Sequence, residues 1–200
     1  MKRGASLYVL CALLAASLAA CAQTPAAEPE ARILYFTYRT DAEPGLLAPS
    51  RLRTALGVQA VSEWGDLMVL HASQPAEAVI IDGAAVAQVN AEDVARLYRE
   101  CVVLAFFNLN APEVAQLVDD PSVAHDGWMD GSEPYPSDFY IIVNRTASGS
   151  FGDCSGATPS ASSYPQGGVG KGRSQYFLAN EADFDIFVGV LITQLAQQEP

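Results

Sequence analysis

Short apolar runs recur along the chain and alternate with segments of helical period. Five runs rich in β-branched and aromatic residues predict strands, at 32–38, 58–61, 78–81, 102–107 and 139–143. The inner runs are apolar throughout instead of alternating with polar residues. That pattern is typical of parallel strands that are buried on both faces.

The segments between and after these runs have helical features. Helices are predicted where a capping residue precedes an apolar stripe or a turn follows one, at 50–56, 62–73, 90–101, 110–118 and 180–195. Residues 62–73 fit two interpretations, a helix capped by Ser62 or a strand over 67–70. We favour the helix because 78–81 follows as a better strand. The last helix has the clearest period, with apolar residues at Phe184, Phe187, Val188, Leu191, Ile192 and Leu195.

Alternation of strands and helices predicts the α/β class. We expect a single three-layer domain, flavodoxin-like or Rossmann-like, with a mostly parallel sheet of about five strands. Residues 146–174 are rich in Ser, Gly and Pro. They predict a long loop that is either functional or locally disordered.

The N-terminal residues form a separate segment. Lys2 and Arg3 precede an apolar run over 5–20, which is shorter than a bilayer-spanning helix needs and indicates a secretory signal. Leu18-Ala19-Ala20-Cys21 resembles the lipobox of bacterial lipoproteins. The resemblance implies that Cys21 carries fatty-acyl chains such as palmitate and anchors a domain facing the periplasm or the cell exterior. The alternative is an ordinary signal peptide that happens to have a cysteine after its cleavage site.

Three regions follow from this interpretation: a signal over 1–20, a lipidated cysteine with an Ala/Pro/Glu-rich tether over 21–31, and a globular domain over 32–200. The 200 residues include 11 Lys+Arg and 23 Asp+Glu, a formal net charge of −12. Binding to nucleic acid needs clustered cations, so we expect no such partner. The expected partner is a membrane, through the N-terminal lipid, and a protein or small-molecule partner stays open.

Two cysteines remain once Cys11 leaves with the signal and Cys21 is acylated. Outside the cytoplasm, Cys101 and Cys154 are able to form a disulfide. The alternative is a reactive thiol at Cys154. We expect no metal site, because two cysteines and two distant histidines lack ligand spacing, and no motif implies a cofactor.

Candidate binding residues follow from one rule. Ligands of open parallel sheets bind beyond the carboxyl ends of the strands. The polar residues that follow the predicted strands are therefore candidates to line a crevice, namely Thr37, Arg39, Asp41, Asp82, Asn108, Asn110, Asn144 and Arg145. The structural alternative is that strand-to-helix loops use Asn and Asp as caps and turns.

The segment Pro75-Ala-Glu-Ala-Val-Ile-Ile-Asp82 resembles the third strand of response-regulator receiver domains, in which the aspartate accepts a phosphoryl group. The order of elements is also similar. The chain departs from the receiver pattern where acids should hold Mg²⁺, because Thr37 and Tyr38 stand there. The resemblance therefore implies a fold and speaks against the activity.

No catalytic motif is complete. The glycine-rich segment 167–174 lacks the first Gly, the Ser or Thr after Lys171 and the preceding strand of a phosphate-binding P-loop. The first predicted loop, Thr37 to Thr40, lacks the glycine of an FMN-binding loop. We therefore expect a lipid-anchored protein whose domain binds a small ligand or a partner, without catalysis. One alternative is a hydrolase or transferase that uses Asp82 or Cys154, and another is an interaction module that uses the acidic, aromatic loop 119–138 with Trp128.

Overall fold

The computed structural model describes residues 32–124, 134–144 and 172–196. Residues from Ala31 to Pro200 form one compact unit with its own cores. The predicted signal and tether lie outside the described residues. Among the described helices, none has the length and apolar character to cross a bilayer.

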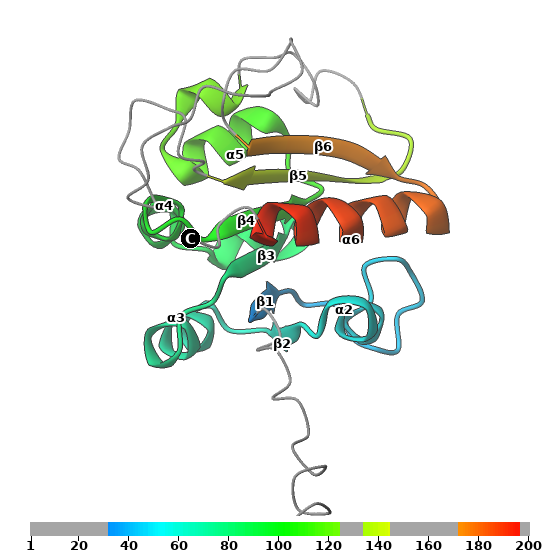
Figure 1. Cartoon of the computed structure of the whole chain (residues 1–200), viewed down its shortest axis with the longest axis horizontal. Helices are drawn as coiled ribbons and strands as arrows, with labels where there is room; N and C mark the ends of the chain where they lie inside the picture. Colours follow the sequence, from blue (N-terminus) through cyan, green and yellow to red (C-terminus); the bar gives the residue numbers. More distant parts are fainter. Residues whose placement is uncertain (1–31, 125–133, 145–171, 197–200) are drawn as a thin grey trace, which may run out of the picture. The chain divides into compact units, whose positions relative to one another are not determined.

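A six-stranded mixed sheet forms the centre of this unit (Figure 1). Its strands are β1 (Ile33–Phe36), β2 (Gln59–Val61), β3 (Ala78–Asp82), β4 (Val103–Phe107), β5 (Asp138–Asn144) and β6 (Gly172–Leu178), in the spatial order β2-β1-β3-β4-β5-β6. The pairs among β2, β1, β3 and β4 are parallel. The predicted α/β class with a mostly parallel sheet is therefore confirmed.

The last two strands differ from the prediction. β5 pairs antiparallel with β4, and β6 pairs antiparallel with β5, from Asp138↔Leu178 to Asn144↔Gly172. The sequence predicted five strands and a loop over 146–174, whereas Gly172 already begins a sixth strand. Backbone pairing with a formed edge stabilises β6 although its own sequence has a weak strand pattern. These antiparallel pairs separate the fold from the expected flavodoxin-like sheet.

Helices cover both faces of the sheet (Figure 1). One face packs against α3 (Trp64–Ser73), α4 (Ala91–Arg99) and α5 (Ala111–Val118), and the other packs against α2 (Pro49–Leu56) and α6 (Glu181–Ala196). Two short 3₁₀ helices, η2 (Gly83–Gln88) and η3 (Pro121–Ala124), follow β3 and α5. The predicted three layers are present because the inner strands are apolar on both faces and need cover on each.

The predicted helix starts are mostly right. Asn90, Asn110 and Asn180 each accept hydrogen bonds from the first turn of their helices. Residues 64–73 are helical, so the alternative strand over 67–70 is wrong. Ser62 is not the cap of α3, which begins at Trp64 without a side-chain cap. The helix predicted over 50–56 begins one residue earlier, at Pro49, a residue that suits the first helical turn.

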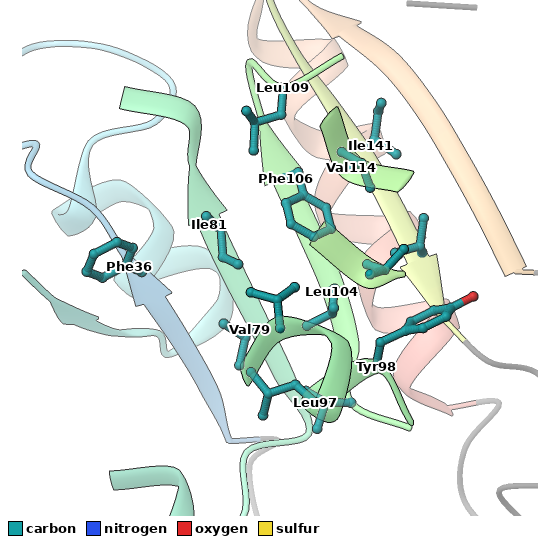
Figure 2. Close-up of a cluster of buried hydrophobic side chains, with 14 of the residues drawn as sticks. Phe36, Val79, Ile81, Leu97, Tyr98, Leu104, Phe106, Leu109, Val114 and Ile141 are labelled. Atoms are coloured by element: carbon teal, nitrogen blue, oxygen red, sulfur yellow. The ribbon is translucent and has the colours of Figure 1, made fainter. Parts of the chain in front are cut away.

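The core beneath α3, α4 and α5 is aliphatic with a few aromatic rings. Figure 2 shows Phe106 and Leu104 of β4 between β3 and β5, and Leu97 of α4 belongs to the same cluster. These side chains are fully buried. Burying a Leu or Phe side chain contributes about 1.5–3 kcal/mol each, so this layer stabilises the unit strongly.

The opposite core is built around Phe187 of α6. Its ring centroid lies 5.0 Å from that of Phe107 and 5.0 Å from that of Tyr140. Phe184 packs 6.3 Å away on the same helix. The predicted α6 stripe therefore faces this core, except that Ile192 is about half exposed.

Helix α4 ends in a Schellman motif. The amide of Cys101 donates to the carbonyl of Tyr98 at 3.2 Å, and the amide of Val102 donates to that of Leu97 at 3.1 Å. This geometry puts Cys101 at φ 67°, which costs a non-glycine residue about 1–2 kcal/mol. Cys101 is disulfide-bonded. The predicted partner, Cys154, lies outside the described residues, so the pairing stays a prediction.

Ionisation of the Tyr140 phenol makes the stability of this core depend on pH. Burial, together with smaller contributions from the nearby Tyr176 and Asp183, raises the pKa of Tyr140 from 10.0 to about 12. The folded state holds the phenol proton more tightly than the unfolded state. The stability from this group is therefore complete below pH 10 and is lost as the pH rises toward 12.

We predict that Tyr140→Phe weakens the loss of stability in alkaline solution. The free energy of unfolding of the native chain should fall by roughly 2–3 kcal/mol more than that of Tyr140→Phe between neutral pH and about pH 12. Urea titrations across this range measure the difference. Parallel curves for the two proteins would contradict the prediction.

Candidate functional site

The carboxyl ends of β1 and β3 lie at the point where the chain's connections diverge. After β1 the chain runs to α2 on one face of the sheet, and after β3 it runs through η2 to α4 on the other. β1 and β3 are neighbours in the sheet. Ligands of open α/β sheets bind at such switch points, because the diverging loops leave room between them.

Asp82 ends β3 at this point and is fully buried. Its Oδ2 accepts hydrogen bonds from Thr37 Oγ1 at 2.9 Å and from Arg39 Nε at 2.7 Å. Its Oδ1 accepts from the amide of Ala84 at 3.2 Å, which caps η2. A buried carboxylate needs such partners, because desolvation of an unpaired charge is costly.

Arg39 is held in place from two sides. Its backbone amide donates to Thr37 Oγ1 at 3.0 Å, and its Nε bonds Asp82. Burial alone would lower the pKa of Arg39, but the hydrogen bond and the charge of Asp82 outweigh burial and raise it above its usual value. The side chain stays 29% exposed, and its two Nη atoms make no hydrogen bond to another described residue. Thr37 and Asp82 thus fix a guanidinium that keeps four N–H donors for other partners.

Tyr35 lies on β1, two residues before Thr37. Its phenol donates to the carbonyl of Leu47 at 3.1 Å. Burial raises its pKa well above the usual value. Tyr35 is therefore a neutral part of the support beneath this edge.

The neighbouring strand end is organised by Asn108, at φ 57° just after β4. Its side chain donates to Asp138 Oδ1 at 2.9 Å and accepts from the amide of Phe139 at 3.0 Å. Asp138 is a residue that the sequence did not single out for this edge. It begins β5, and the antiparallel direction of β5 brings that beginning to the carboxyl ends of the parallel strands. Its negative charge also raises the pKa of Arg39.

No sequence signal could have placed Asp138 here. A helix, α5, connects β4 to β5, and a helical connection is typical of parallel neighbours. The direction of β5 depends on its pairing with β4 and β6, which are remote in sequence.

Other predicted site residues have structural roles. Asn110 forms a capping box with Glu113, with bonds of 2.9 and 3.0 Å. Asp41 is half exposed and lies 3.6 Å from Arg53. For these two residues the structure favours the alternative of caps and loops.

Asn144 is a correction. We expected it beside Asp82, but Asn144 is the last residue of antiparallel β5 and lies at the opposite edge of the sheet. It is buried, and its amide donates to Gln194 Oε1 of α6. Arg145, Cys154 and Trp128 lie outside the described residues.

Among the described residues, no group of three or more His, Cys, Asp and Glu side chains is placed to hold a metal ion. Comparison of the chain with protein-family models, with curated proteins and with solved structures finds no match. The function of this edge therefore has to be inferred from the residues that form it.

Gly83 lets the two strand ends approach each other. A Cβ atom at Gly83 would lie 2.7 Å from the carbonyl oxygen of Asn108 and 2.8 Å from that of Phe107. Both contacts are with backbone atoms, which yield little. The turn after Asp82 thus needs glycine to lie against the end of β4.

We predict that Gly83→Ala destabilises the protein by about 1–3 kcal/mol, because the chain must shift to relieve the contact. Gly65→Ala is the matched control, since no atom lies within 4 Å of a Cβ there. In α3 that change should be neutral or should stabilise by up to about 1 kcal/mol. Thermal and urea unfolding measure both variants, and equal stabilities would contradict the steric account.

Proposed function

We propose that this chain is a lipoprotein, anchored through Cys21, whose α/β domain binds a small ligand with an anionic group at the edge formed by Thr37, Arg39 and Asp82. The domain faces the periplasm or the cell exterior. Binding needs no cofactor in this proposal, and nucleic acid is not the ligand, since the net charge is −12.

The single observation behind the binding proposal is the position of Arg39. Its guanidinium is oriented through Nε by a fully buried carboxylate, yet part of the side chain is exposed at the switch point of the sheet. An oriented guanidinium presents donors in a planar arrangement that matches carboxylate and phosphate oxygens. Side-chain entropy is already lost before a ligand arrives, which favours binding.

The same contacts favour binding over the hydrolase or transferase alternative that uses Asp82. Both of its oxygens accept hydrogen bonds within the chain, and none of the residue is exposed. A nucleophile or general base has to reach its substrate. Asp82 is better suited to position Arg39 than to react.

We predict that inorganic phosphate or acetate shifts the Nε–H resonance of Arg39 in ¹H–¹⁵N spectra of a chain that begins at Ala22. The bond to Asp82 should make this resonance slow to exchange and well resolved. Arg39→Gln should weaken phosphate or acetate binding by about ten- to a hundredfold, because a charge-assisted contact contributes about 1.5–3 kcal/mol.

Arg53→Gln is the control for that experiment. Arg53 lies on nearby α2, is about half exposed and pairs only loosely with Asp41 at 3.6 Å. Its replacement should leave binding unchanged. If neither phosphate nor acetate shifts the Nε–H resonance of Arg39 more than that of Arg53, the binding proposal is wrong.

The anchor has its own prediction. Mass spectrometry of the mature protein from its native membrane should find Cys21 as the first residue and acylated. Cys21→Ser should release the protein from the membrane, because it removes the acceptor of the lipid. A mature chain that begins with an unmodified Cys21, or before it, would contradict the lipoprotein proposal and leave the binding proposal standing.

A further inference from the structure

Asp138 brings a second carboxylate to the edge at which Arg39 lies. Its Oδ1 accepts a hydrogen bond from Asn108 Nδ2 at 2.9 Å. Its Oδ2 has no hydrogen bond or ion pair with another described residue, and the residue is only partly buried. An ionised carboxylate accepts several hydrogen bonds, so Asp138 has capacity left for a molecule outside the chain.

Asn108 fixes the position of Asp138 against the end of β4. Its backbone amide donates to the carbonyl of Phe139 at 3.0 Å, and its side-chain oxygen accepts from the amide of Phe139 at 3.0 Å. Three hydrogen bonds thus join Asn108 to the first two residues of β5. Asp138 is held in place before a ligand arrives, which lowers the entropy cost of binding.

A continuous series of contacts connects Asp138 with Arg39. Gly83 follows Asp82 and lies so close to Asn108 that a Cβ atom on it would be 2.7 Å from the Asn108 carbonyl oxygen. Asp82 holds Arg39 at one of these adjacent strand ends. Asn108 holds Asp138 at the other. The charge of Asp138 acts on Arg39 across this distance, since it helps to raise the pKa of the guanidinium.

The charges at this edge do not balance. Asp82 and Arg39 form an ion pair at 2.7 Å, so together they are neutral. Asp138 has no ion pair with a described cation and leaves one negative charge. A simple anion on Arg39 would bring a second negative charge near Asp138, and like charges side by side are unfavourable. A ligand that also has a cationic group would place a positive charge beside Asp138 instead.

We propose that this edge binds zwitterions, which are small molecules with a carboxylate and an ammonium group, such as amino acids. The ligand carboxylate accepts hydrogen bonds from the two Nη atoms of Arg39, and the ammonium group donates to Oδ2 of Asp138. The planar guanidinium matches a carboxylate, and the three ammonium N–H groups suit a carboxylate oxygen. This inference rests on the proposed binding at Arg39 and adds Asp138 as the residue that selects the class of ligand.

A metal ion that bridges Asp138 and an anionic ligand is a poorer occupant. Calcium takes six to eight oxygen ligands, and magnesium needs a near-octahedral set. Among the described residues, no three His, Cys, Asp or Glu side chains are grouped to supply them. An ammonium group needs only hydrogen-bond acceptors, and Asp138 Oδ2 provides one.

Glycine and acetate are matched probes, because an ammonium group in glycine replaces one hydrogen of acetate. In ¹H–¹⁵N titrations of a chain that begins at Ala22, both should shift the Nε–H resonance of Arg39. Only glycine should also shift the side-chain amide of Asn108, since that amide bonds the carboxylate that receives the ammonium group. The pairs β-alanine with propionate and 4-aminobutyrate with butyrate extend the comparison to longer ligands.

The best zwitterion should bind at least about fivefold more tightly than the carboxylate of equal length. The reason is that an ion pair with a partly exposed carboxylate adds to the contact with Arg39. Isothermal titration calorimetry measures the two affinities in each pair.

Asp138→Asn separates the charge from the hydrogen bond. Asparagine keeps an oxygen acceptor for Asn108 and removes the negative charge, so the fold should be retained. The variant should bind acetate more tightly than the native chain does and should lose the preference for zwitterions. A merely structural role of Asp138 would change both affinities in the same direction. Asp185→Asn is the matched control, since Asp185 is exposed on α6, and it should leave the ratio of the affinities unchanged.

Three outcomes overturn the inference. One is equal affinity within every pair of probes, and another is a preference for zwitterions that persists in Asp138→Asn, because a different group would then hold the ammonium. In both cases a shift of Arg39 by acetate leaves the binding proposal standing. The third outcome is that no probe shifts Arg39, and then the binding proposal fails together with the inference.

Discussion

Burial of the inner strands on both faces is the constraint from which the architecture follows. Every residue of β1, β3 and β4 is buried. Their apolar side chains alternate between two cores, one beneath α3, α4 and α5 and the other beneath α2 and α6. A strand with two apolar faces is stable only between two layers of helices. The connections must then leave the sheet toward opposite faces, and this divergence creates the edge at which Arg39 lies.

Asp82 is a charged residue at the end of one of these buried strands. A carboxylate at the end of a fully buried strand has lost its hydration, and three hydrogen-bond donors replace the water. Loss of one of them would leave charge without compensation. The position of Arg39 is therefore set by the requirement of the buried Asp82 carboxylate for hydrogen-bond donors. An anionic ligand that approaches Arg39 is attracted by the guanidinium and repelled by the carboxylates of Asp82 and Asp138, which favours ligands that reach the exposed end of the side chain.

Sequence patterns correctly predicted those features that depend on interactions between residues close together in the chain. The stripe of α6 and the caps at Asn90, Asn110 and Asn180 depend on neighbours within a few residues, and they were right. The meeting of Thr37, Arg39 and Asp82 was also predictable, because parallel strands end at one edge. The direction of β5 and the existence of β6 were not, because backbone pairing between distant segments decides them. The misplacement of Asn144 and the omission of Asp138 share this single cause.

The pairing of Asn144 with Gly172 has a consequence for how the protein can change over evolution. These two residues are opposite each other on one rung of the ladder, so the 27 residues between them leave and re-enter the sheet at neighbouring points. Doubling the length of a closed connection costs only about 0.6 kcal/mol in chain entropy. The ladder between β5 and β6 therefore fixes where this connection begins and ends, so a change in its length leaves the register of the two strands to be set by their own pairing.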